Sequence, residues 1–381
     1  MAGVVLLAMN LRPTITGVGP LIGVISRNTG LGTQWAGSLT TLPLIAFGLI
    51  SPIVPALARR WGLNATLLLG LILLTVGTLI RSIGSISMLL AGMFLVGSGV
   101  AIVNVLLPSL VKREFSTRIG LMTGLYSTVM GVFAALASGI SIPLAMDTSL
   151  GWRGALGIWA ILSFIGVLAW LPQIRHRQNS PLLARGTLWR SPLAWYVTLF
   201  MGLQSLLFYV NVAWFPTLLH SLGMSLAGAG WMVSWMQLIS LPGSFLMPIW
   251  ASRRKDQRGL MLITGILFVL GYIGILVEGT TWAWLWIACI GFAGGASISL
   301  ALTYFSLRTK NERDATELSG MAQSVGYVLA ALGPITIGFL YHLTAGWTAP
   351  LLLLLTTSIL MLAAGIPASR NLTVQVSSEK S

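Results

Sequence analysis

The stretch that decides the fold is LLLGLILLTVGTLI, residues 67–80, in which no residue carries a charge. Apolar segments of the same kind recur along the chain, for example at residues 197–219 and 351–366. With the glycine, serine and threonine around them, such segments reach roughly 20 residues, the length at which a helix crosses the hydrocarbon core of a bilayer. We therefore expect an all-α membrane protein.

The composition of the whole chain agrees with this expectation. Hydrophobic residues make up 56% of the 381 residues, charged residues only 8%, and the mean hydropathy is +0.88, values that exclude a water-soluble globule. The first apolar segment continues past residue 20 and lacks the charged start of a signal peptide, so we count it as a span. Twelve spans are predicted, at residues 2–26, 36–58, 64–81, 87–110, 120–145, 153–172, 193–219, 226–250, 259–278, 282–306, 318–341 and 348–366.

The basic residues predict the topology. The formal net charge is +14, but the charges lie in short clusters between apolar segments, which argues against a nucleic-acid partner. Most of the 22 Lys and Arg residues fall after even-numbered spans: Arg59, Arg60, Lys112, Arg113, Arg118, Arg175, Arg177, Arg185, Arg190, Arg253, Arg254, Lys255, Arg258, Arg308, Lys310, Arg313, Arg370 and Lys380. Only Arg27, Arg81 and Arg153 fall on the other side. This bias predicts a multi-pass protein of the cell membrane with both termini in the cytoplasm.

An internal repeat with an offset of 196 residues divides the chain into two halves. It relates Pro20 to Pro216, Trp35 to Trp231 and Lys112 to Arg308, among other pairs. Because each half holds an even number of spans, the repeat is parallel, with a pseudo-two-fold axis along the membrane normal. We expect two six-helix bundles at residues 1–172 and 193–367, a polar, basic cytoplasmic linker at 173–192 and a cytoplasmic tail at 368–381.

Arg12 is the sharpest functional signal. About ten residues of helix precede it, which places it roughly 15 Å into the bilayer, where a charge costs at least about 2.5 to 3.5 kcal/mol. None of the eight acidic residues falls at that depth. A guanidinium there suits an anion or an electron-rich polar heterocycle, although a snorkelling arginine is an alternative. Pro13 removes a backbone donor, so the first span is expected to kink or open beside Arg12.

Further candidate substrate-binding residues follow from the repeat and from polar positions inside spans. Phe208 corresponds to Arg12, and Gln204, Phe208 and Asn211 share one helical face. The full candidate set is Asn10, Arg12, Thr16, Asn104, Gln204, Phe208, Tyr209, Asn211, Trp214, Gln323 and Tyr327. Bonds between helices are the alternative for Gln204 and Asn211, and an interfacial aromatic belt is the alternative for Trp214.

Other chemistry finds little support in the sequence. Cys289 is the single cysteine and lies in an apolar span, and the histidines do not pair into a metal site, so we expect no cofactor and no metal. A nucleotide-binding motif is absent, which favours secondary transport. Neither a nucleophile with its base nor a long signalling tail is present, so an intramembrane enzyme and a receptor are disfavoured.

Four groups of residues resemble the major facilitator superfamily, and within it the cyanate porter group. These are Asn10-Leu11-Arg12-Pro13 with Gly19-Pro20-Leu21; Asn104-Val105-Leu106-Leu107-Pro108 leading to Lys112-Arg113; Gly202-Leu203-Gln204-Ser205 with Phe208-Tyr209 and Trp214-Phe215-Pro216; and Leu318-Ser319-Gly320-Met321 through Gly333-Pro334. The resemblance covers nearly the whole chain. One departure is Arg59, which stands where the superfamily usually has an acid in the loop after the second span.

The resemblance implies the major facilitator fold and a monomer that moves a small solute by alternating access, with Arg12 in a central site. Members of the group carry cyanate or 2-nitroimidazole, so the expected solute is a small anion or a polar heterocycle. The alternative is a proton-coupled efflux carrier, for drugs or metabolites, whose solute is a neutral heterocycle. Besides the solute, membrane lipid is the expected partner.

Overall fold

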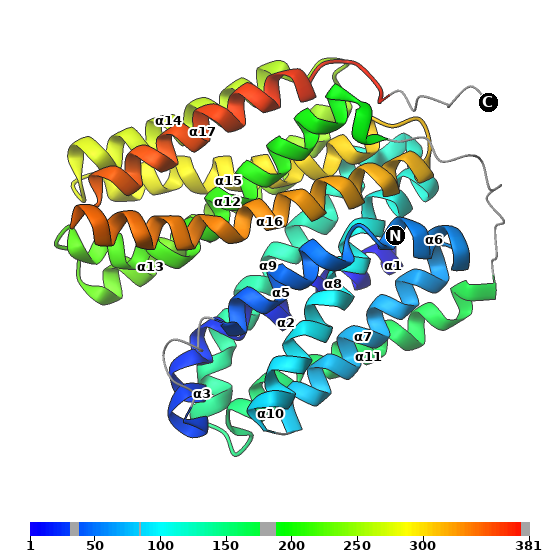
Figure 1. Ribbon diagram of the computed structural model, residues 1–381, viewed down its shortest axis with the longest axis horizontal. Helices are drawn as coiled ribbons and strands as arrows, with labels where there is room; N and C mark the ends of the chain where they lie inside the picture. The colour runs from blue at the N-terminus through cyan, green and yellow to red at the C-terminus, as the bar shows by residue number, and fades with distance from the viewer. Residues whose placement is uncertain (31–37, 84, 176–187, 375–381) are drawn as a thin grey trace. The chain divides into compact units, whose positions relative to one another are not determined.

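The computed structural model describes residues 1–30, 38–83, 85–175 and 188–374 (Figure 1). Within these ranges every regular element is a helix. Among the described residues, eleven helices are long and apolar enough to cross a membrane, and the pair Thr41–Ile50 and Val54–Trp61, bent by 55°, makes a twelfth if it forms one span. Trp35, most of the predicted linker and the end of the predicted tail lie outside the described residues.

The chain divides into two compact units, Met1–Val111 with Val129–Ala184, and Lys112–Thr128 with Arg185–Ser381. The helices that lie wholly or mainly in the first unit are α1 (Ala2–Leu11), α2 (Pro13–Thr16), α3 (Ile22–Thr29), α5 (Ser38–Ile50), α6 (Val54–Trp61), α7 (Leu63–Ile83), α8 (Ile86–Glu114), α9 (Ile119–Met146), α10 (Gly151–Gly157) and α11 (Trp159–Trp170), with short 3-10 turns at η1 (Gly19–Leu21) and η3 (Leu171–Arg175). The end of α8 and the start of α9, with η2 (Ser116–Arg118) between them, group with the second unit.

Glycine pairs bring α7 and α8 into backbone contact. A Cβ at Gly77 would lie 2.9 Å from the carbonyl oxygen of Gly92, and a Cβ at Gly99 would lie 2.6 Å from the carbonyl oxygen of Gly70. Small residues allow this approach in a membrane, where dispersion and close packing drive helix association. The tight crossing fixes the register of the two helices at these glycines.

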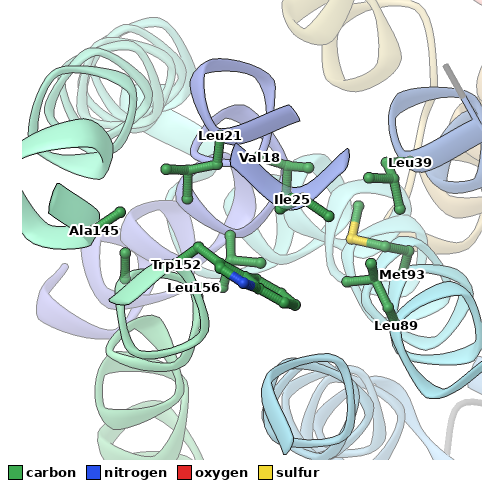
Figure 2. Packing of buried hydrophobic residues seen from close by; sticks show 10 residues of the cluster. Val18, Leu21, Ile25, Leu39, Leu89, Met93, Ala145, Trp152 and Leu156 are labelled. Carbon is green, nitrogen blue, oxygen red and sulfur yellow. The ribbon is translucent and has the colours of Figure 1, made fainter. Parts of the chain in front are cut away.

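A hydrophobic cluster packs around one end of α7 and α8. Figure 2 shows side chains from α3, α8 and α10 converging with those of the segment around η1. Its buried members are Val18, Leu21, Ile25, Leu39, Leu89, Met93, Ala145, Trp152, Ala155 and Leu156. The cluster holds the second part of the first span against α8, α9 and α10.

The described part of the second unit contains six long helices and the turn η4 (Leu188–Arg190). They are α12 (Pro192–Ser221), α13 (Leu226–Ser252), α14 (Arg258–Glu278), α15 (Ala283–Leu307), α16 (Glu312–Thr344) and α17 (Thr348–Ala368). In this unit α12 packs against α16 and α17, α13 packs against α15, and α14 lies against both α15 and α17 (Figure 1).

The helix bounds agree closely with the predicted spans, with some informative differences. The second predicted span, 36–58, is divided into α5 and α6, and the sixth, 153–172, into α10 and α11. The first span is divided into α1, α2, η1 and α3. Helix α16 begins at Glu312, six residues before the predicted start, because the side chain of Asn311 caps it by accepting a hydrogen bond from the backbone N–H of Asp314. Hydropathy alone cannot detect this polar first turn.

Candidate functional site

The first span breaks at Arg12. Helix α1 ends at Leu11 and the single turn α2 begins at Pro13, so Arg12 is both the C-cap of α1 and the N-cap of α2. Proline is well placed at the first position of α2, since the N–H it lacks would have no partner in the helix there. The predicted opening of the span beside Arg12 is confirmed. The side chain of Arg12 is half-buried.

Hydroxyl groups of α9 hold the broken segment in place. Ser138 Oγ donates to the carbonyl of Thr16 at 3.2 Å, and Ser141 Oγ donates to the carbonyl of Gly17 at 2.9 Å. The Thr16 hydroxyl lies 3.1 Å from the carbonyl of Arg12 and 3.2 Å from the carbonyl of Ala134, both of which can accept from it. Thr16, a predicted site residue, is thus engaged in fixing the backbone that carries Arg12.

The other two candidates of the first unit are buried. Asn10 donates from Nδ2 to the carbonyl of Leu6 at 2.8 Å, and the same Nδ2 would lie 3.4 Å from a Cβ at Gly166 of α11. Its Oδ1 is buried without a hydrogen-bond partner among the described residues. Asn104 lies on α8 with 5% of its surface exposed. Asn10 therefore points toward the helix packing of its own unit.

Aromatic rings gather where α12 and α16 pack together in the second unit. Phe208 and Tyr209 meet edge to face with ring centroids 5.3 Å apart, and Tyr209 meets Tyr327 in the same way at 6.4 Å. Gln323, one turn before Tyr327 on α16, donates to the Ser319 hydroxyl at 2.9 Å. We call Phe208, Tyr209, Gln323 and Tyr327 the aromatic group.

The aromatic group depends on a close crossing of α12 and α16. A Cβ at Gly202 would lie 3.1 Å from Cα of Gly326, and a Cβ at Gly326 would lie 3.2 Å from Cα of Gly202. Two facing glycines therefore let the helix backbones touch. Because Tyr209 and Tyr327 follow these glycines on their own helices, the crossing sets the separation of their rings.

The remaining three candidates have bonds within the second unit. Gln204 donates from Nε2 to the Met201 carbonyl at 3.0 Å and to the Ser205 hydroxyl at 2.7 Å. Trp214 Nε1 donates to the carbonyl of Pro334 at 2.9 Å. The Tyr272 hydroxyl of α14 donates to Oδ1 of Asn211 at 3.0 Å. Asn211 thus makes the bond between helices that was the alternative to solute binding.

The Asn211–Tyr272 bond leads to a prediction that separates the two roles of Asn211. We expect Asn211→Leu and Tyr272→Phe each to weaken the unit by roughly 0.5–1 kcal/mol, with less than additive effects in the double variant and an unchanged KM for the solute. Thermal unfolding and transport kinetics of the three variants measure this. Tyr196→Phe, at an exposed tyrosine of α12, is the control. A raised KM in Asn211→Leu alone would assign Asn211 to solute binding instead.

Two arginines that sequence analysis groups with loop charges are buried in the structure. Arg81 is 1% exposed in the last turn of α7, and Arg308 is 2% exposed at the C-cap of α15. Their places at the ends of spans agree with the prediction, but sequence analysis did not predict that both side chains reach backbone carbonyls of distant segments. Arg81 did carry a signal, since it is one of few basic residues on the side that the positive-inside bias leaves poor in charge.

The described residues offer no group of three or more His, Cys, Asp or Glu side chains that could hold a metal ion. Cys289 is half-buried on α15 and forms no disulfide. Guanidinium, amide, hydroxyl and aromatic groups are therefore the chemistry that the candidate residues offer. They can bind and orient a polar solute by hydrogen bonds and ring contacts.

Comparisons with known proteins give a consistent result. A family model described as "Major Facilitator Superfamily" matches residues 4–334 and 205–380. The chain is 47% identical over 375 residues to an uncharacterized transporter, YycB, of Bacillus subtilis (strain 168), covering 97% of this chain and 93% of that one. It is 40% identical over 379 residues to the 2-nitroimidazole transporter of Escherichia coli (strain K12), covering 97% and 95%.

A more distant relative and a solved structure extend these matches. The chain is 27% identical over 347 residues to the cyanate transport protein CynX of Escherichia coli (strain K12), covering 90% of each chain. The crystal structure of FucP, a transporter of the same superfamily in the outward conformation, matches with a TM-score of 0.76 at 14% identity, covering 96% of this chain and 98% of that one. At this low sequence identity the structural match supports the fold only.

Proposed function

Because the chain belongs to the major facilitator superfamily and is a multi-pass membrane transporter rather than an enzyme, we propose that Arg12 binds its solute and that the solute is a small anion or a polar, electron-rich heterocycle. Transport is secondary and proceeds by alternating access. The bundles are residues 1–172 and 193–367, the protein acts as a monomer, and both termini lie in the cytoplasm.

The position of Arg12 is the observation that carries the proposal. Arg12 is half-buried at the joint of α1 and α2, inside a span of 28 residues. An arginine at this depth is retained only where it serves a cavity, a partner or a solute. The planar fork of five N–H donors matches planar oxygen and nitrogen acceptors, as in cyanate or a nitro group.

The aromatic group supports the heterocyclic version of the proposal. The rings of Phe208, Tyr209 and Tyr327 offer apolar faces, and Gln323 lies one turn from Tyr327 on the same helix. Small-molecule sites commonly combine such apolar walls with a few polar groups that set orientation. Two relatives are named for 2-nitroimidazole and for cyanate, and both solutes carry oxygen and nitrogen atoms that can accept hydrogen bonds.

A second candidate is a neutral heterocycle exported with proton coupling. The higher identity to the 2-nitroimidazole transporter, 40% against 27% for the cyanate transport protein, favours a ring-shaped solute over a linear anion. In this version Arg12 donates to a nitro or ring acceptor and no net charge of the solute is needed.

Flux measurements in proteoliposomes test the proposal. We expect saturable transport of 2-nitroimidazole, of cyanate or of both, and none of xylose at the same concentration. An imposed membrane potential will change the flux of an anion but not of an uncoupled neutral solute, and a pH gradient will drive the neutral solute only if protons are coupled to it. A bound solute should also raise the Tm, by an amount that keeps growing with the logarithm of the solute concentration above its Kd. Absence of both saturable flux and stabilisation for every planar polar solute would refute the proposal.

A further inference from the structure

The guanidinium of Arg81 is enclosed inside the first unit, where it contacts neutral groups. Nη1 donates to the carbonyl of Thr14 and, at 3.4 Å, to Sδ of Met93, and Nη2 donates to the carbonyl of Leu156 at 3.4 Å. In the described part of the chain none of these partners is a carboxylate, and Nε is buried without a hydrogen-bond partner. Such a charge is costly to bury, so its strongest contact, with Thr14, calls for an explanation.

The carbonyl of Thr14 is available because the first span unwinds just after it. In a continuous α-helix the N–H of Val18 would donate to this carbonyl. Here the N–H of Val18 donates to the carbonyl of Ile15 at 3.3 Å, and the chain continues into the 3-10 turn η1. A backbone carbonyl buried in an apolar environment needs another donor. Arg81 supplies it across 67 residues of sequence.

Three backbone carbonyls of the broken segment accept hydrogen bonds from side chains of two different helices. Those of Thr16 and Gly17 accept from Ser138 and Ser141 of α9. That of Thr14 accepts from Arg81 of α7. The single turn α2 is therefore held by two helices, and the α7 side depends on one side chain.

The residues packed around Arg81 leave it little room to move. A Cβ at Gly92 would lie 2.6 Å from both the Cβ and the backbone N of Arg81, so α8 passes directly against this residue. Met93 and Leu156, which contact the guanidinium, belong to the hydrophobic cluster of Figure 2. Packing on this side makes Arg81 a fixed anchor for α2.

We infer that Arg81 is a positioning residue for Arg12: by holding the carbonyl of Thr14 it fixes α2, and with it the backbone of Arg12, which is the N-cap of α2 and lies two residues away. This inference rests on the proposed function of Arg12. Arg81 itself does not contact the solute. Its loss should misplace the guanidinium of Arg12 without removing it.

Kinetics of Arg81 variants provide the first test. In proteoliposomes with 2-nitroimidazole and cyanate as probes, we expect Arg81→Met, which is apolar and of similar length, to raise KM by about tenfold or more with the maximal rate within about threefold of the wild type. Arg81→Lys keeps the charge but loses the planar fork of donors, so its KM should lie between that of the wild type and that of Arg81→Met. Arg153→Met is the matched control, because Arg153 is exposed and lies over the ring of Trp152 in the same unit.

A second readout does not depend on the solute. In a Cys289→Ala background, Arg12→Cys places a thiol at the joint, and its rate of alkylation by a small thiol reagent reports the position of that residue. We expect adding Arg81→Met to change this rate by at least about threefold, and adding Arg153→Met to leave it unchanged. If Arg81→Met does not fold, the same alkylation measurement is made with Arg81→Lys.

The outcomes separate the two claims. A raised KM with an altered alkylation rate supports the positioning role. A lower Tm with unchanged KM and unchanged alkylation would overturn it and leave Arg81 a purely structural residue. If the wild type transports neither probe and no other planar polar solute is transported or raises the Tm, the proposed function fails, while the alkylation rates still decide whether Arg81 positions residue 12.

Discussion

Replacing Arg12 by alanine is expected to lower the rate of solute transport at least about a hundredfold, because a charge-assisted contact of about 3 kcal/mol is lost. Folding should be retained. The bonds of Ser138, Ser141 and Thr16 that hold the broken span use backbone carbonyls rather than the guanidinium. Arg12→Lys should transport at an intermediate rate, since a lysine keeps the charge but not the planar fork.

Uptake into proteoliposomes at several solute concentrations, with thermal unfolding of each variant, measures this effect. Arg27→Ala is the control, because Arg27 belongs to the same span but is exposed and bonds only to the carbonyl of Gly23 among the described residues. It should transport like the wild type. Wild-type kinetics in Arg12→Ala would remove Arg12 from the solute site, and a misfolded Arg12→Ala together with an active Arg12→Lys would assign it a structural role.

The second large effect is expected on stability, from Arg308→Ala in the second unit. Arg308 Nε donates to the Ala368 carbonyl at 2.8 Å, and Nη2 donates to the Ser369 carbonyl at 3.0 Å and to Oε1 of Gln257. The guanidinium carbon also lies 5.1 Å from the ring centroid of Tyr304. One side chain thus ties together the end of α15, the start of α14 and the end of α17.

Truncation of Arg308 would leave the Ala368 carbonyl and Oε1 of Gln257 without this donor, and the Ser369 carbonyl with only the backbone N–H of Gln257. Each buried acceptor that loses its donor costs about 1–3 kcal/mol, so we expect a loss of about 3 kcal/mol, which for a unit of this size lowers the Tm by about 10 °C. Differential scanning calorimetry or a thermal-shift assay in detergent measures it. Arg253→Ala, at an exposed arginine close to the start of α14, should change the Tm by less than about 2 °C. Equal stability of the two variants would contradict the role assigned to Arg308.

The break in the first span could be predicted from sequence because its cause is local. Pro13 lacks an N–H, and Gly17, Gly19 and Pro20 follow within two turns. Only the structure, however, identifies the donors that satisfy the freed carbonyls. Those donors are Arg81, Ser138 and Ser141, and they lie 67 to 124 residues away along the chain.

Candidate residues chosen by polarity at span depth have different environments. Asn211 is bonded to Tyr272 of another helix, Gln204 is bonded within its own helix, and Asn10 faces α11. Polarity and spacing identify a helix face but not the neighbour that occupies it. Each residue of the aromatic group could be predicted from sequence as a candidate. That their side chains lie together depends on the close crossing of α12 and α16 at the facing glycines Gly202 and Gly326.

The sequence by itself determined the number, type and approximate bounds of the spans, because an apolar chain in lipid must satisfy its backbone hydrogen bonds within each helix. The same local physics determined where the first span breaks. Only the tertiary structure decided that Arg81 and Arg308 turn inward, because a charge at a helix end can reach either the membrane surface or the carbonyls of another helix. Which it reaches depends on the register of packed helices, and that register is not a local property of the sequence.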